Sequence, residues 1–290
     1  MVMELWLILG ILSYLLYAIS TSIDKYLMNH KFDPILTNTI KMFFDEIILL
    51  LAGILFLEFT IPFGFNLFFI FLLGLLYATS GILYFESLKL DDVTEIIPYF
   101  QSFSILLIFI SSLIFFKETA TFINYFGIIL ILIGVYFILS KKGFKLLSLN
   151  KGIYLISIVI ILGVTYTILT KSLLYNIKPI NLSILMYFFA TIILSGYVLV
   201  FQKKLITKTK ELVKPKNLTK IIITSFFGAF GTLLLYLALS IGDASKVYPI
   251  AGAQSMFIFI IGVIFLKEKF YWHRLIGIIF IFIGIYFVSI

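Results

Sequence analysis

The second long apolar run of the chain, residues 35–57, contains three charged residues: Lys41, Asp45 and Glu46. A charge at the centre of a membrane helix costs about 2.5 to 3.5 kcal/mol on insertion scales, so such groups usually face a cavity or a partner. Lys41 and Asp45 are four residues apart, on one helix face, where they can pair. Two interpretations stay open: an ion pair that locks helices together, or a role in substrate or proton coupling.

Two further acidic residues differ in their expected surroundings. Glu46 lies about 100° around the helix from Asp45, so the two carboxylates need not share one environment. Glu86 lies one turn before the end of another apolar run, residues 66–88. It is a candidate for proton coupling or for binding a cationic group, with an interfacial position as the alternative.

Tyrosines and amides recur inside the apolar runs and are candidates for lining a cavity. Several tyrosines with few fixed charges would suit a zwitterionic, aromatic or amphipathic solute, through ring stacking and cation–π contacts. Hydrogen bonds between helices are the alternative use of such groups. The candidates are Tyr14, Tyr77, Tyr84, Tyr99, Gln101, Tyr166, Tyr236, Tyr248 and Gln254.

Two prolines precede several of these polar residues. Pro98 and Pro249 each lie one turn into an apolar run, where proline removes a backbone donor and kinks a helix. Kinked helices at matching positions in two halves of a chain point to a transporter site. We therefore expect both prolines near a binding cavity.

The elements that position these residues are membrane helices. Of the 290 residues, 62% are hydrophobic and 12% are charged, with a mean hydropathy of +1.17, whereas soluble domains carry about 25% charge. A bilayer core of roughly 30 Å requires about 20 apolar residues per helix. Ten runs of this kind occur: 5–23, 35–57, 66–88, 93–116, 121–140, 152–170, 180–201, 221–241, 247–266 and 271–290. The sequence predicts an all-α, multi-pass membrane protein.

The chain is also a duplication. Residues 117–140 recur as residues 267–290 at an offset of 150, with the Lys-Glu pair, two glycines and a closing Tyr-Phe at matching positions. Five runs per half is an odd number, so the halves must enter the membrane from opposite sides, as in the inverted repeats of secondary transporters. The predicted organisation is a first five-helix repeat (1–140), a basic linker (141–151) and a second repeat (152–290).

Charge and composition exclude several function classes. The net charge of +8 lies between the apolar runs, so we expect no nucleic-acid partner. The chain has no cysteine, and neither HExxH, GxSxG nor a Gly-rich phosphate loop occurs. We expect no catalytic residue, no metal and no cofactor. The excess of Lys and Arg on one side predicts that both termini lie outside the cell.

The sequence resembles the EamA-domain form of the ten-helix drug/metabolite transporter (DMT) superfamily. The resemblance depends on residues 98–118, PYFQSFSILLIFISSLIFFKE, and residues 249–268, PIAGAQSMFIFIIGVIFLKE, with a small-residue stretch before each proline. It implies a basket of helices: the first four of each repeat surround a central cavity, and the fifth is peripheral. It also implies alternating access, and termini in the cytoplasm, contrary to the charge bias.

We therefore expect a secondary transporter of the plasma membrane that exports or exchanges small metabolites such as amino acids. The alternatives are an organic-anion, nucleotide-sugar or sugar-phosphate antiporter of the same superfamily, and a non-transporting membrane scaffold or enzyme. The expected partners are a small-molecule substrate and the lipid bilayer. Protons are a further candidate, and so is a second copy of the chain, since Gly127 and Gly134 could pack within or between subunits.

Overall fold

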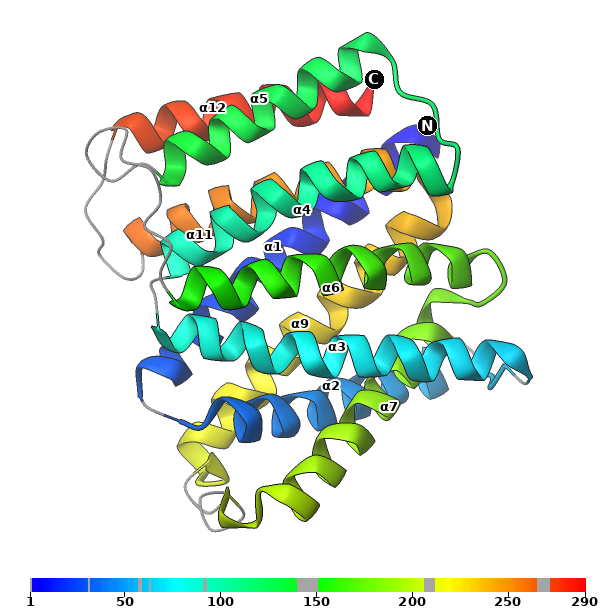
Figure 1. Ribbon diagram of the computed structural model, residues 1–290, viewed down its shortest axis with the longest axis vertical. Helices are drawn as coiled ribbons and strands as arrows, with labels where there is room; N and C mark the ends of the chain where they lie inside the picture. The colour runs from blue at the N-terminus through cyan, green and yellow to red at the C-terminus, as the bar shows by residue number, and fades with distance from the viewer. Residues whose placement is uncertain are drawn as a thin grey trace.

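The chain is described here from a computed structural model, which covers residues 2–30, 32–56, 59–62, 64–90, 93–139, 151–205, 212–264 and 272–290. These residues form an all-α structure with ten helices of seven or more residues (Figure 1). The helices are α1 (Val2–Asn29), α2 (Pro34–Phe56), α3 (Phe65–Leu90), α4 (Val93–Phe115), α5 (Phe122–Leu139), α6 (Lys151–Leu174), α7 (Pro179–Phe201), α9 (Pro215–Ile241), α11 (Gly252–Ile264) and α12 (Trp272–Ser289). A short α10 (Ala244–Val247) and a 3₁₀ turn, η1 (Tyr248–Ala251), lie between α9 and α11. The expected linker residues 141–150 lie outside the described part of the chain.

Length and composition confirm a multi-pass membrane protein. Six helical segments of the described chain are each long and apolar enough to cross a bilayer, and three shorter apolar helices accompany them. The helix α2 is also long enough, but it carries Lys41, Asp45 and Glu46 near its middle. Each of the ten predicted runs thus corresponds to a helix or to the α10–η1–α11 segment.

The packing of the helices follows the predicted inverted repeat. Matching the halves in order pairs α1 with α6, α2 with α7, α3 with α9, α4 with α11 and α5 with α12. Helix α1 packs against α9, and its counterpart α6 packs against α3, while α2 packs against α7 and α5 against α12. The helices α1 and α6 start at opposite ends of the bundle in Figure 1, so the halves run in opposite directions. The expectation of two inverted five-helix repeats is confirmed.

Glycines bring α5 and α12 into close contact at the edge of the bundle. A Cβ atom added to Gly134 would lie 2.5 Å from the carbonyl oxygen of Gly277, and one on Gly127 would lie 2.7 Å from that of Gly284. Any side chain at these positions would therefore push the two helices apart. The matched glycines pack against each other within one chain.

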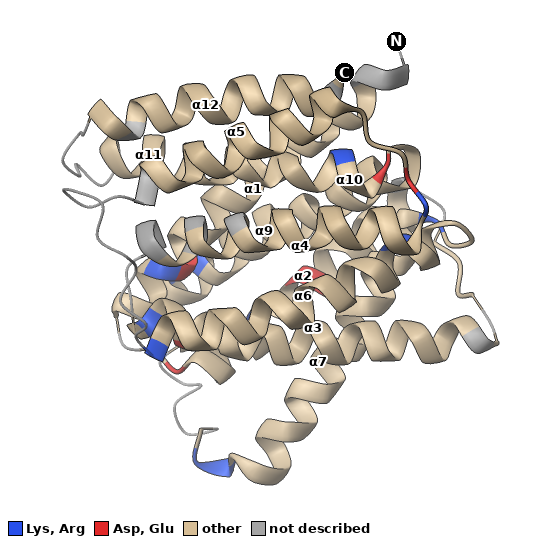
Figure 2. Cartoon of the chain, turned by 45° about the horizontal axis from the view of Figure 1, so that its top comes forward, with Lys and Arg blue, Asp and Glu red and all other residues tan. Residues whose placement is uncertain are grey.

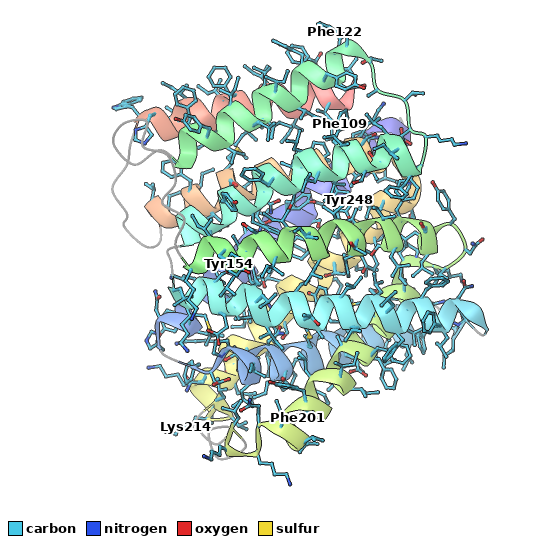
Figure 3. All side chains as sticks on the ribbon, viewed as in Figure 1. Phe109, Phe122, Tyr154, Phe201, Lys214 and Tyr248 are labelled. Carbon is cyan, nitrogen blue, oxygen red and sulfur yellow. The ribbon has the colours of Figure 1, made fainter. Side chains whose placement is uncertain are left out.

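The outer surface is apolar, as lipid contact requires. Large side chains such as Phe122 and Phe201 point outward and are 86% and 72% exposed (Figure 3). Lys and Arg residues lie mainly near the ends of the helices (Figure 2). Buried polar and charged side chains instead gather inside the bundle, on α1, α2, α6 and α9 among others.

Candidate functional site: a central cavity

A cavity of about 260 Å³ lies between the two halves of the chain. Its described wall comes from α1, α2, α3 and α4 of the first half, and from α6, α9, η1 and α11 of the second. Among the described residues, α5, α7 and α12 contribute nothing to the wall. The cavity is therefore built between the repeats, and α5 and α12 are peripheral. The helix α7, which the resemblance placed around the cavity, does not contribute to its described wall.

The first wall element is a polar stripe on α1. Tyr17, Ser20, Thr21 and Asp24 all line the cavity, and they recur at intervals of three or four residues. Residues with this spacing lie on one face of an α-helix. The helix α1 therefore turns this polar face toward the cavity.

An ion pair joins α1 to α2 in this wall. Lys41 Nζ lies 2.6 Å from Asp24 Oδ2 and also donates to Ser20 Oγ at 3.0 Å. The other oxygen of Asp24 accepts a hydrogen bond from Thr224 of α9 at 2.8 Å. Because Lys41 pairs with Asp24, the expected Lys41–Asp45 ion pair is not the one that forms.

Asp45 also lines the cavity, and it is 1% exposed. Its Oδ1 atom has no hydrogen-bond partner. The neighbouring Ser225 hydroxyl donates to the backbone carbonyl of Lys41 at 3.0 Å. Asp45 is thus a buried carboxyl group with unused hydrogen-bonding capacity.

Hydroxyl groups connect four helices at and behind the cavity wall. Thr232 Oγ1 on α9 is hydrogen-bonded to the hydroxyl of Tyr17 on α1 at 2.9 Å and to that of Tyr187 on α7 at 2.8 Å. The Tyr187 hydroxyl is in turn 3.2 Å from that of Tyr77 on α3. This network fixes the ring of Tyr77 at the cavity surface.

Glutamines join the two halves across the cavity. Gln101 Nε2 on α4 donates to Gln254 Oε1 on α11, and Gln254 Nε2 donates to Thr21 Oγ1 on α1 at 3.2 Å. All three residues line the cavity. Opening the cavity between α4 and α11 would require breaking this pair.

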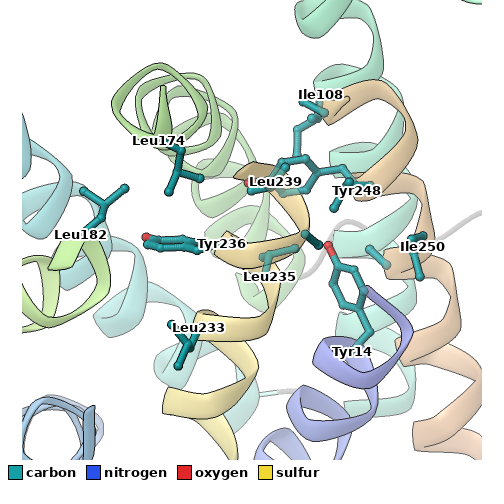
Figure 4. Packing of buried hydrophobic residues seen from close by; sticks show 14 of the residues in the cluster. Tyr14, Ile108, Leu174, Leu182, Leu233, Leu235, Tyr236, Leu239, Tyr248 and Ile250 are labelled. Carbon is teal, nitrogen blue, oxygen red and sulfur yellow. The ribbon is translucent and has the colours of Figure 1, made fainter. Parts of the chain in front are cut away.

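The structure brings most of the sequence candidates together. The wall includes Tyr14, Tyr77, Tyr84, Gln101, Tyr166, Tyr248 and Gln254, together with Lys41 and Asp45. Figure 4 shows Tyr14, Tyr236 and Tyr248 entering this region from α1, α9 and η1. Tyr236 is fully buried behind the wall, where its hydroxyl is hydrogen-bonded to that of Tyr166.

Three candidates point elsewhere, and helix geometry explains why. The hydroxyl of Tyr99 is hydrogen-bonded to that of Ser157 on α6 at 3.0 Å, and Tyr99 does not line the cavity. It is two residues from Gln101, about 200° around the helix, because each residue turns a helix by about 100°. Glu46, about 100° around α2 from Asp45, and Glu86, about 200° around α3 from Tyr84, do not line the cavity either.

The two prolines differ in their backbone. Pro249 is buried in the 3₁₀ turn η1, which separates α10 from α11, so the α-helix is interrupted there. Helix α4 is continuous from Val93 to Phe115, through Pro98, whose side chain lies outside the described part. The interruption places Tyr248 and Ala251 of η1 in the cavity wall.

Sequence reasoning missed Asp24, Ser20 and Thr21. The apolar run 5–23 appeared to end just before Asp24, whereas α1 continues to Asn29. A usable signal was present, since Tyr17, Ser20 and Asp24 repeat at helical spacing. Within the described residues, no group of three or more His, Asp or Glu could hold a metal ion.

The α9–α10 turn is held by hydrogen bonds from both halves of the chain. Glu118, after α4, accepts hydrogen bonds from the backbone N–H groups of Ala244 and Ser245, each at 2.8 Å. Lys171 Nζ donates to the carbonyl oxygens of Leu239 and Gly242, also at 2.8 Å. Glu118 thus holds the α9–α10 turn against the first half, and Lys171 of α6 holds it within the second half.

The EamA-like transporter family matches the chain twice, at residues 4–140 and at residues 150–290. The chain belongs to the EamA-like transporter family. It is therefore a multi-pass membrane protein of the DMT superfamily, and membership places it among transporters rather than enzymes.

Other comparisons agree with this fold. A solved crystal structure of a protein with 14% sequence identity superposes with a TM-score of 0.72, covering 99% of this chain and 98% of that one. The Uncharacterized protein MJ1333.1 of Methanocaldococcus jannaschii is 40% identical over 75 residues, which cover 26% of this chain. The match spans only about half of that relative, 55% of its length.

Proposed function

We propose that this EamA-family protein is a secondary active transporter that exports or exchanges small metabolites such as amino acids. The observation that supports this proposal is the cavity of about 260 Å³ between the inverted halves. In inverted-repeat transporters the substrate site lies between the repeats, and rocking of one repeat against the other exposes it to each side in turn. A cavity of this size, lined by tyrosine rings and a few polar and charged side chains, suits a solute of amino-acid dimensions.

The charges of the wall favour this solute class over phosphorylated anions. Among its described residues, the wall contains two carboxylates, Asp24 and Asp45, and one lysine, Lys41, which is already paired with Asp24. A phosphate-binding site needs compensating Lys or Arg side chains. A sugar-phosphate or nucleotide-sugar antiporter is therefore the weaker alternative.

Counterflow exchange in proteoliposomes tests the proposal. Vesicles that contain the purified chain would be loaded with one unlabelled solute and incubated with the same labelled solute outside, across amino acids, amines, carboxylates and sugar phosphates. We expect accumulation of a labelled amino acid or amine above that in protein-free vesicles. Exchange of sugar phosphates alone would support the alternative, and exchange of no solute would contradict transport.

We propose that the protein lies in the plasma membrane. We also propose that both termini lie outside the cell, because the excess of Lys and Arg is on the opposite side of the membrane. The chain has no cysteine. A single cysteine added after Ile290 would react with an impermeant maleimide on intact cells if this orientation is right. Reaction only after cell lysis would instead support cytoplasmic termini.

A further inference from the structure

Asp45 is a buried ionisable group whose charge the neighbouring side chains do not balance. It is 1% exposed, it lines the cavity, and its Oδ1 atom has no hydrogen-bond partner. An ionised carboxylate in such a place is unfavourable unless it is paired, so it either binds a proton or meets a cation. The structure therefore leaves Asp45 in need of a positive charge.

The nearest candidate partner is already engaged. Lys41 Nζ forms its ion pair with Asp24 at 2.6 Å and donates to Ser20 at 3.0 Å. Asp24 in turn accepts a hydrogen bond from Thr224. Lys41 is therefore fully engaged with Asp24 and Ser20. The described wall contains two carboxylates and one lysine, so the charge of one carboxylate is not balanced.

The other elements around Asp45 do not supply a second cation. The charged and titratable groups that influence it are Lys41 on its own helix, Asp24 on α1, Tyr77 on α3 and Tyr187 on α7. Helix α9 contributes the uncharged Ser225. Glu46 follows Asp45 in sequence but does not line the cavity. Apart from Lys41, these groups are neutral or acidic.

The surrounding wall suits an organic cation. The rings of Tyr77 and Tyr166 both line the cavity, with centroids 5.7 Å apart. Aromatic faces attract ammonium groups through the negative potential of the ring, and a neighbouring carboxylate adds a direct ion pair. A carboxylate with one unbonded oxygen and no ion pair of its own, next to tyrosine rings, matches the chemistry of an ammonium-bearing solute.

We propose that Asp45 binds one positive charge at a time, either a proton or the ammonium group of the transported solute. When the solute binds to protonated Asp45, the carboxyl proton leaves to water and the ammonium group takes its place. One monovalent cation then replaces one proton, and the charge in the cavity is unchanged. The inference rests on the proposed transport function and specifies its substrate class and its exchange partner.

Calorimetry of the full-length protein with two matched probes tests this inference. Phenethylamine carries an ammonium group on an aromatic frame, and 3-phenylpropionate carries a carboxylate on the same frame. Titration in two buffers with different ionisation enthalpies gives the number of protons released per probe bound. The variants are Asp45→Asn and, as a matched control at the residue that caps the same helix, Asp33→Asn. Asp33 caps α2 through the N–H groups of Ile35 and Leu36, a role that Asn also fills.

We expect wild-type protein at acidic pH to bind phenethylamine with release of about one proton, because binding and protonation compete at one carboxyl group. Affinity for 3-phenylpropionate should be at least about tenfold weaker. Asp45→Asn should lose the proton release and at least about tenfold in phenethylamine affinity, whereas Asp33→Asn should keep both.

Three results would overturn the inference: unchanged binding and proton release in Asp45→Asn, tighter binding of 3-phenylpropionate than of phenethylamine, or binding of neither probe. The counterflow assay separates this failure from failure of the proposed function. If the wild type exchanges a solute and Asp45→Asn exchanges it equally well, the proposed transport function is supported and the role of Asp45 is contradicted. Exchange of no solute by the wild type would contradict transport itself.

Discussion

Lys171 donates a hydrogen bond from Nζ to the carbonyl oxygen of Leu239 at 2.8 Å, and Lys25 makes the same bond to Leu88 at 2.7 Å in the other half. The two lysines occupy matching positions in the repeat, and so do the two leucines. Leu239 and Leu88 lie in the last turns of α9 and α3, where carbonyl groups lack helical partners. In each half, a lysine of the first helix therefore donates a hydrogen bond to a carbonyl group in the last turn of the third helix.

Replacing either lysine should destabilise the fold. Lys171→Met leaves buried carbonyl groups without a donor, which costs about 1 to 3 kcal/mol, and Lys25→Met should act in the same direction. The exposed Lys203→Met is the control, since surface substitutions usually change stability by less than about 0.5 kcal/mol. Melting of the purified variants checks this. Equal melting temperatures for Lys171→Met and Lys203→Met would show that the capping bond adds nothing.

Glu118 should act as a cap across the two halves. Its carboxylate oxygens accept the N–H groups of Ala244 and Ser245, which begin α10. Losing such a cap costs about 0.5 to 2 kcal/mol, so Glu118→Ala should melt at a lower temperature. Glu118→Gln keeps one side-chain acceptor and should fall between Glu118→Ala and the wild type. The opposite order, with Gln below Ala, would contradict a capping role.

The Thr232 hydroxyl should contribute measurably to the stability of the fold, because it joins two tyrosines from other helices. Thr232→Val keeps the shape but removes the hydrogen-bond partner of Tyr17 and one partner of Tyr187. A buried hydroxyl left unsatisfied costs about 1 to 3 kcal/mol. Thr79→Val is the control, because the exposed Thr79 hydroxyl donates only to the carbonyl of Leu75 in its own helix. We expect a clear drop in melting temperature for Thr232→Val alone, and equal effects would count against the network.

The glycine contact between α5 and α12 predicts opposite results for two Gly-to-Ala changes. Gly134→Ala would place a methyl group 2.5 Å from the carbonyl oxygen of Gly277, and overpacking of this kind costs about 1 to 3 kcal/mol. Gly196→Ala meets nothing within 4 Å and should gain up to about 1 kcal/mol of helix propensity. Thermal melting distinguishes them, and a harmless Gly134→Ala would refute the close approach of these helices.

The sequence predicted the architecture well, because it depends on features that are local or repeated. Apolar runs of membrane length define helices, and an odd number of helices per repeat requires inversion. The matched positions of Lys25 and Lys171 even mark equivalent hydrogen bonds in the two halves.

The site was predicted less completely, because it depends on neighbours from other helices. From the sequence alone, a charged residue that faces an internal cavity cannot be distinguished from one that ends a membrane span. Asp24 was missed for this reason. The spacing of Lys41 and Asp45 showed only that they could pair within one helix. In the folded chain, Asp24 of α1 lies next to Lys41 and forms the ion pair instead. Tyr99 was placed in the cavity because it lies near Gln101 in sequence, although helix geometry turns it toward Ser157.

The central claim is that one cavity between the inverted halves opens to each side of the membrane in turn. Ser104 lines this cavity and is 7% exposed, and the chain contains no cysteine, so Ser104→Cys places a single thiol in the wall. The measurement is the rate at which membrane-impermeant maleimides label this thiol from each face of oriented vesicles. We predict labelling from both faces, slowed by an exchanged solute. Labelling from one face only, unchanged by any solute that the protein exchanges, would contradict alternating access.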